Sequence, residues 1–332
     1  MINKSIMVKR QKIKLIINYP KLANFYIFLS DLSQWNKLTS FPNRKRVWLK
    51  QIPPLSLEEK NALRQFRDIL QNSKDNPEVI LLFAPASQAW QTIQKIIGQD
   101  ETKKLKLVFK VFESKFKTVW KKRYSDFIKL KAAIQSQKTA IKQALQIINS
   151  LCNISSTKLL SPIIIRLLFS QSRNDVQAWA YRNIIAIEGS SYPLKKIDDL
   201  TNGILLHEYF HLALNQNVRI KNKIIFLSRE HKNLLLKLKI PSWPPHIILE
   251  EALVSSFIPE GYLSKKLSQK NIKKDALQQI NRKNIERLLK MRYFCALKMY
   301  NLAKKYIDSQ KPIDSKYLNT VVNVLKQFNK IY

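Results

Sequence analysis

The stretch GILLHEYFHLAL, from Gly203 to Leu214, decides how the rest of the chain is interpreted. It is apolar except at His207, Glu208 and His211, and no proline interrupts it, so the pattern predicts a buried helix. Histidines four positions apart lie one turn apart on the same helix face, and both imidazoles can reach one ion. Glu208, next to the first histidine, can exchange protons with a metal-bound water. The stretch therefore predicts a metal site carried by a buried helix.

The bland alternative is a core helix whose two histidines are hydrogen-bonded or face solvent. Burying polar side chains without partners costs about 1–3 kcal/mol each, and a shared ligand removes that cost. The chain has only four histidines, so an H-E-x-x-H pattern is uncommon in it by chance. We therefore favour a zinc ion over a core helix without a metal.

A catalytic zinc site needs three protein ligands and a water. The longer pattern H-E-x-x-H-x-x-G-x-x-H is absent, because Leu214 and Asn217 stand at its glycine and its third histidine. A second apolar helix, predicted over 246–257, carries Glu250 and Glu251. An acidic pair in such a helix is costly unless a cation neutralises it. The two side chains point about 100° apart, so one of them is expected to complete the site.

These two helices resemble those of the gluzincin group of zinc metallopeptidases, in which H-E-x-x-H is followed by a helix with Glu-Ala or Glu-Gly. The resemblance covers about residues 160–265, where Glu251-Ala252 matches that step. It implies that the metal ligands are His207, His211 and Glu251. It also implies that the general base is Glu208. Glu250 is the alternative ligand. Ser255 stands where the family often has an aspartate, and a serine is a weaker partner for a histidine ligand.

Three further polar residues are candidates for stabilising the oxyanion of a tetrahedral intermediate: His231, His246 and Tyr262. For each of them the alternative is an ordinary surface or packing residue, since only proximity in the sequence supports the functional role.

The remaining patterns predict an α+β fold that is predominantly helical and zincin-like, with a small sheet flanking the H-E-x-x-H helix and the second, glutamate-bearing helix. Strands are predicted at Val79–Phe83, Leu105–Val111, Ile163–Phe169 and Tyr181–Ile187. Helices are predicted after the Ser56–Glu59 capping box, from Ala89 to Gly98, from about 112 to 127, from about 126 to 149, after Thr201 or Asn202 as a cap, and beyond about 270, with Asp314 or Ser315 capping the last. We expect an N-terminal helical or α+β region of unknown role at 1–150, and a zincin-like domain with C-terminal helices at 151–332.

The composition limits the classes of partner. A chain of 332 residues with 45% hydrophobic residues is long enough for two folded domains. A net charge of +36 would ordinarily point to nucleic acid. Here lysine far outnumbers arginine and the basic residues are spread along the chain, as a strongly AT-rich coding sequence would produce by drift. We expect no specific nucleic acid, and only a weak attraction of acidic partners at low salt.

The two cysteines, Cys152 and Cys295, have no metal-binding spacing and are expected to be free, buried thiols. No signal peptide stands out, and no stretch approaches the roughly 20 apolar residues of a membrane span. These features favour a soluble, cytoplasmic protein.

Together these patterns predict zinc-dependent hydrolysis of peptide or protein substrates by a metal-activated water. Two alternatives stay open. One is a catalytically inactive zinc-binding scaffold that docks an acidic partner, and the other is a basic nucleic-acid-binding protein that carries the motif by accident.

Overall fold

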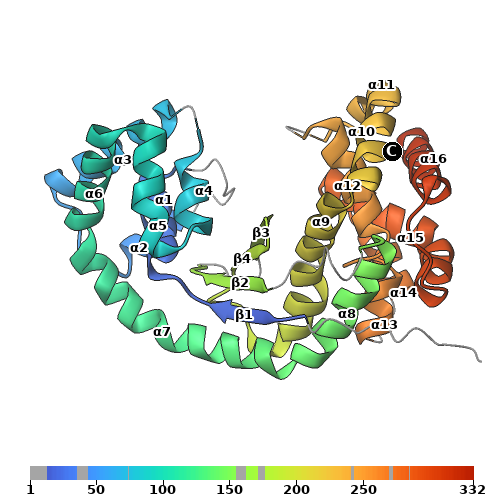
Figure 1. The fold of residues 1–332 in the computed structure, drawn as a ribbon, viewed down its shortest axis with the longest axis horizontal. Coiled ribbons are helices and arrows are strands. Elements are labelled where there is room, and N and C mark those ends of the chain that lie inside the picture. Colours follow the sequence, from blue (N-terminus) through green and yellow to red (C-terminus); the bar gives the residue numbers. More distant parts are fainter. Residues whose placement is uncertain are drawn as a thin grey trace, which may run out of the picture. The chain divides into compact units, whose positions relative to one another are not determined.

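The computed structural model describes residues 13–35, 44–73, 75–154, 162–170, 176–240, 243–268, 272–283 and 285–332. Most of them lie in helices, and the described strands form one four-stranded sheet (Figure 1). The predominantly helical α+β fold class is thereby confirmed.

The chain divides into two compact units. The N-terminal unit is built from described residues within 16–136 and 164–197, and the C-terminal unit from those within 137–163 and 198–332, with a short piece before residue 16. This division differs from a boundary at residue 150, because the strands after residue 163 group with the N-terminal unit. The functional roles expected for 1–150 and 151–332, and a sheet that flanks the metal-site helices, stay predictions.

Seven helices are described in the N-terminal unit: α1 (Lys21–Ser33), α2 (Arg44–Leu49), α3 (Leu57–Asn72), α4 (Pro77–Phe83), α5 (Ala86–Ile97), α6 (Gln99–Val111) and α7 (Glu113–Ser136). The central helix is α1, which packs against α2, α3 and α4 and is buried on all sides from Ala23 to Ser33. The capping box of Ser56 and Glu59 is confirmed at the start of α3.

Two predicted strands in this unit are helical instead. The run Val79–Phe83 forms most of α4, because Pro77 provides a favourable first helical residue and a short apolar run fits either structure. The run Leu105–Val111 ends α6, in which the buried side chains of Leu105, Val108 and Phe109 follow helical spacing. The alternation of lysine with apolar residues there is a coincidence of the sequence.

The sheet has the strand order β1 (Leu15–Asn18), β2 (Ile163–Leu168), β4 (Ile184–Glu188), β3 (Gln177–Tyr181). Strands β2 and β4 are parallel, and β3 and β4 are antiparallel. The strand predicted at 163–169 is confirmed. The strand predicted at 181–187 begins too early, because Arg182 adopts a left-handed conformation, with φ of 55°, and turns the chain between β3 and β4. A 3-10 turn, η2 (Leu194–Lys196), follows β4.

The C-terminal unit is described as a helical assembly: α8 (Lys138–Leu151), η3 (Asp199–Leu205), α9 (Leu206–Gln216), α10 (Val218–Glu230), α11 (Lys232–Lys237), α12 (Pro245–Ser255), α13 (Tyr262–Ser268), α14 (Ile272–Ile280), α15 (Arg287–Asp308) and α16 (Ser315–Ile331). The single helix predicted over 126–149 is two, since the chain breaks at Gln137 between α7 and α8.

Helix α12 is the centre of the C-terminal unit, since it packs against α9, α10, α11, α15 and α16. It is apolar on nearly every face, and its buried residues run almost continuously from Ile248 to Ser255. The C-terminal helices α15 and α16 pack against α12, which carries Glu250 and Glu251. Asp314 caps α16 as predicted, because its carboxylate accepts a hydrogen bond from the Tyr317 amide.

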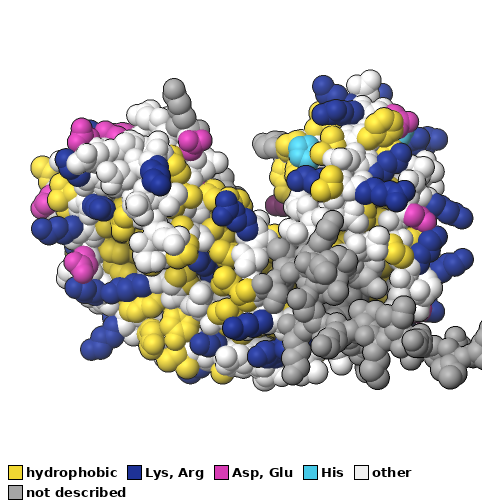
Figure 2. Space-filling view, viewed as in Figure 1, with side chains coloured by type: hydrophobic (Ala, Val, Ile, Leu, Met, Phe, Trp, Pro, Cys, Tyr) yellow, Lys and Arg dark blue, Asp and Glu magenta, His cyan; other side chains and the backbone are white. Residues whose placement is uncertain are grey.

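The surface is basic without a dominant patch on the face drawn in Figure 2, where lysine and arginine side chains are scattered over both units. Cys152 and Cys295 are buried free thiols, as expected. Within the described ranges, no helix combines the length and the hydrophobicity that crossing a bilayer requires.

Candidate metal centre

The H-E-x-x-H stretch lies in one uninterrupted helical segment. The π-helical turn η3 runs directly into α9, and the backbone is already helical at Leu205. The predicted capping by Thr201 or Asn202 is therefore wrong, and the Thr201 hydroxyl instead donates to the side chain of Gln137. Short π-helical turns of this kind occur often at functional sites. Burial of the apolar face of α9 fixes the direction in which both histidines project.

The second helix, α12, begins where the sequence suggested. Pro245 is its first residue, a position where a missing amide proton costs nothing. Its contact with α9 brings Glu250 and Glu251 to the two histidines. Glu251 is buried and Glu250 is partly buried. Two histidines of α9 and a glutamate about 40 residues further along the chain thus meet between two packed helices.

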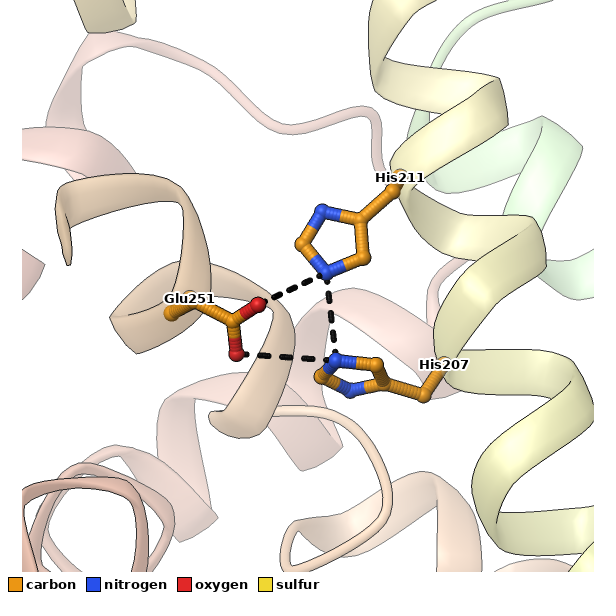
Figure 3. A group of neighbouring side chains, drawn as sticks. All are labelled: His207, His211 and Glu251. Atoms are coloured by element: carbon orange, nitrogen blue, oxygen red, sulfur yellow. Dashed lines mark hydrogen bonds and ion pairs between the residues drawn. The ribbon is translucent and has the colours of Figure 1, made fainter. Parts of the chain in front are cut away.

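Figure 3 shows His207, His211 and Glu251 turned toward a common point. The two Nε2 atoms are 3.1 Å apart. One carboxylate oxygen of Glu251 lies 3.2 Å from Nε2 of His211, and the other lies 3.5 Å from Nε2 of His207. The three side chains form the metal-binding group found among the described residues.

Both histidines are held by their other ring nitrogen. Nδ1 of His207 lies 3.3 Å from the carbonyl oxygen of Ile258, which can only accept, so Nδ1 carries the proton. Nδ1 of His211 lies 2.6 Å from a carboxylate oxygen of Glu250 and donates to it. Such contacts fix the orientation of metal-binding imidazoles and raise their basicity. Both Nε2 atoms are left facing Glu251.

The dimensions of this group fit a small divalent cation. In a tetrahedral site with bonds of about 2.0–2.1 Å, ligand atoms lie about 3.3–3.4 Å apart. The two Nε2 atoms are 3.1 Å apart, and they lie 3.2 and 3.5 Å from two different oxygens of Glu251. With one ligand atom taken from each residue, the three atoms lie within 4.8 Å of one another. In addition, Oε2 of Glu251 is buried and accepts no hydrogen bond from the described residues. Two imidazoles and one carboxylate are a donor set typical of catalytic zinc.

The side chains of this group shift one another's pKa values. Burial and the positive charge of Arg292 lower the pKa of His207. Burial alone would also lower the pKa of His211, but hydrogen bonds with Glu250 and Glu251 raise it to about 10. Although burial opposes it, the neighbouring imidazoles of His207 and His211 hold the pKa of Glu251 well below its usual range.

Glu208 lies beside this group on α9 and is half-buried. Burial raises its pKa to about 7, with the negative charges of Glu251 and Glu250 adding to the rise and His211 and Arg292 opposing it. A carboxyl group with a pKa near neutrality can accept and release a proton at the pH of most cells.

The structure separates the roles of the two glutamates. Glu251 faces both Nε2 atoms, whereas Glu250 hydrogen-bonds the far nitrogen of His211. Ser255, which stands where the family often has an aspartate, accepts a hydrogen bond from Arg292 at 3.0 Å. Glu250 supplies the carboxylate that the serine lacks.

The three oxyanion candidates are not joined to the triad by any contact in the described part of the chain. His231 lies between α10 and α11, 3.8 Å from Glu230. His246 is exposed in the first turn of α12. Tyr262 packs edge-on against Tyr300, with ring centroids 5.4 Å apart. Their proposed role stays a prediction.

Two charged residues near the site were missed in the sequence. Arg292 of α15 pairs with Glu260 at 3.0 Å, and the Glu260 side chain is only 6% exposed. A signal was present, because Arg292 stands on the buried stripe of α15 with Cys295, Ala296 and Met299. A charged residue on an apolar stripe indicates a buried partner, but the sequence does not show which partner it is.

No protein-family model, curated protein or solved structure matches this chain. The resemblance to gluzincins therefore rests on the H-E-x-x-H spacing, on the glutamate of α12 and on the group that these residues form.

Proposed function

We propose that this protein is a zinc-dependent peptidase that hydrolyses peptide or protein substrates. The observation that carries the proposal is the convergence of His207, His211 and Glu251. The two Nε2 atoms lie 3.1 Å apart and 3.2 and 3.5 Å from the two oxygens of Glu251. Each histidine is also held through its Nδ1 atom, by the Ile258 carbonyl and by Glu250. This arrangement leaves two lone pairs and a carboxylate for one ion.

When bound, a zinc ion supplies a Lewis acid for the scissile carbonyl and lowers the pKa of a bound water to about 7. The chain's own residues manage the protons. The carboxylate of Glu208 takes a proton from the attacking water and delivers it to the nitrogen of the leaving amine as the C–N bond breaks. His207, His211 and Glu251 hold the ion, and Glu250 fixes the ring of His211.

The test is the variant Glu208→Gln, which keeps the size of the side chain and is not a ligand. It is expected to bind zinc as the wild type does and to lose hydrolysis of a mixed peptide library by a factor on the order of 10²–10⁴. Glu230→Gln is the matched control, because Glu230 lies at the end of α10 with its side chain 51% exposed.

Full hydrolysis by zinc-bound Glu208→Gln would overturn the assignment of the general base. A zinc-loaded wild type that cleaves no member of the library favours the inactive scaffold. Salt-sensitive binding of DNA or RNA that chelators leave unchanged favours the nucleic-acid-binding alternative.

A further inference from the structure

The segment that follows α12 contacts both His207 of the candidate metal centre and Arg292 of α15. It runs from Ser255, the last residue of the helix, to Gly261. Within it, the carbonyl oxygen of Ile258 accepts the hydrogen bond from Nδ1 of His207, at 3.3 Å. The position of this carbonyl therefore determines how the His207 ring is held and which of its nitrogens carries the proton.

Arg292 of α15 contacts both ends of this segment. Its Nε donates to the hydroxyl of Ser255 at 3.0 Å, and its Nη2 pairs with the carboxylate of Glu260 at 3.0 Å. The arginine side chain is 20% exposed and that of Glu260 is 6% exposed, so the ion pair is largely shielded from solvent. A planar guanidinium that makes both contacts fixes the two ends relative to each other.

Close packing transmits this constraint along the segment. A Cβ atom on Gly261 would lie 2.2 Å from the carbonyl oxygen of Ser256, so the chain folds back on itself without space for a side chain. A displacement of Glu260 therefore has little room to be absorbed before it reaches Ile258.

Aromatic and hydroxyl contacts hold the part of the segment that precedes Ile258. Phe257 stacks on Phe210 and on Tyr317, with ring centroids 5.4 and 4.9 Å away. The Ser256 hydroxyl lies 2.8 Å from the hydroxyl of Tyr317. On the far side, the ion pair of Glu260 is the charged contact, and one of the two carboxylate oxygens has no hydrogen-bond partner among the described residues.

We propose that Arg292 is a positioning residue for the zinc site. By holding Ser255 and Glu260 it presents the Ile258 carbonyl to Nδ1 of His207, and this leaves Nε2 of His207 with its lone pair toward the metal. The inference rests on the proposed zinc site and extends it to a third helix, α15, which contributes no ligand.

The experiment compares Arg292→Met with Arg287→Met. Arg287 is a suitable control because it lies on the same helix and donates to main-chain carbonyls, those of Leu238 and Tyr332. Zinc affinity is measured by competition with a chromophoric chelator. We expect Arg292→Met to lose about 10–100-fold in affinity, the range found when a partner of a metal-binding histidine is removed, and Arg287→Met to keep wild-type affinity.

A second readout needs no metal. The chain has only four histidines, so selective ¹⁵N-histidine labelling gives a simple NMR spectrum of the metal-free protein. The wild type is expected to show His207 with its proton on Nδ1, and Arg292→Met to show a mixture of tautomers. A general loss of packing would not by itself select one tautomer of one histidine.

If Arg292→Met does not fold, the same two measurements are made on Arg292→Lys. The lysine keeps a positive charge beside Glu260 but lacks the planar guanidinium that also donates to Ser255. A weaker zinc affinity together with a mixed His207 tautomer supports the proposal. Wild-type affinity and tautomer in a folded Arg292 variant overturn it and leave the peptidase proposal untouched. A wild type that binds no zinc overturns both.

Discussion

Both units bury polar and charged side chains, and Asn24 and Arg166 of the N-terminal unit differ in their partners from the group at the candidate metal site. In the N-terminal unit, Asn24 is fully buried and contacts only main chain in its described hydrogen bonds: the Pro20 and Leu167 carbonyls and the Phe169 amide. Arg166 is 5% exposed and donates to the carbonyls of Leu82 and Ala84, at the end of α4. These side chains complete the hydrogen bonding of backbone where an element ends.

At the candidate metal site of the C-terminal unit, polar side chains contact one another. His207, His211 and Glu251 turn their ligand atoms toward one point, and Glu250 holds His211 from behind. The comparison shows that burial of charge does not by itself mark a site. A group of facing ligand atoms whose outer atoms already have partners is what distinguishes a metal centre from a structural contact.

The largest expected effect is that of zinc on stability. Because zinc would bind only the folded site, a free zinc concentration of 1,000 times Kd is expected to stabilise the metal-free protein by about 4 kcal/mol. His211→Ala should remove this stabilisation, since it removes an Nε2 ligand. Thermal unfolding with zinc and with a chelator measures it. His231→Ala is the matched control, and equal stabilisation of His211→Ala and wild type would place the metal elsewhere.

Removal of a structural contact should lower the free energy of unfolding and leave the zinc affinity unchanged. Arg166→Met leaves the carbonyls of Leu82 and Ala84 without their donor, and is expected to lower the free energy of unfolding by about 2–4 kcal/mol. Zinc affinity should not change, because both of these partners lie in the N-terminal unit. Urea unfolding and zinc titration of the same preparation measure the two quantities. A parallel fall in zinc affinity would break the distinction between the two units.

The sequence predicted the contents of the site better than its arrangement. The spacing of His207 and His211 fixes their common helix face, and an acidic pair in an apolar helix indicates a buried cation. The choice between Glu250 and Glu251 depends on how α12 packs against α9, which no local pattern encodes. Arg292 lies far along the chain on α15, so its role follows only from the packing of α15 on α12.

The two strand predictions that were wrong also have local causes in the sequence. The Val79–Phe83 run is too short for periodicity to separate strand from helix. Pro77, at the first position of α4, favours the helix. Over Leu105–Val111 two periodicities coincided, and the acidic first turn of α6 at Asp100 and Glu101 favoured the helix. The Ile163–Phe169 run had no competing pattern, and its strand was predicted correctly.

The two glutamates of α12 provide the next test. Glu250→Gln keeps a hydrogen bond to His211 but loses the charge, and is expected to lower zinc affinity by about 10–100-fold, or about 1.4–2.7 kcal/mol. Glu251→Gln removes a ligand and should lose more. A chelator competition titration ranks them. If Glu251→Gln kept its zinc while Glu250→Gln lost it, Glu250 would be the ligand.

The smallest effect concerns a structural contact within the unit that carries the metal site. Asp314 caps α16 through the Tyr317 amide at 2.9 Å, and removing such a cap costs about 1 kcal/mol. Asp314→Ala should therefore lower the free energy of unfolding by that amount in urea titrations and leave zinc affinity unchanged. A loss of zinc affinity would mean that any weakening of packing in the C-terminal unit affects the site. A loss of affinity in Arg292→Met would then not indicate a specific positioning role.

The contribution of Asp314 should also depend on pH. Although partial burial opposes it, hydrogen bonds with Lys311, Tyr306 and the Tyr317 amide lower the pKa of Asp314 to about 2. A depressed pKa in the folded state means that the stabilisation is complete above the unfolded pKa of about 3.9 and is lost as the pH falls toward 2. The difference in stability between wild type and Asp314→Ala is thus expected to shrink between pH 4 and pH 2, by the rule that fewer protons bound in the folded state favour folding at higher pH. If the stability difference between wild type and Asp314→Ala stayed constant over this range, the cap would act through its hydrogen bond in either protonation state. The contribution of Asp314 would then not depend on its charge.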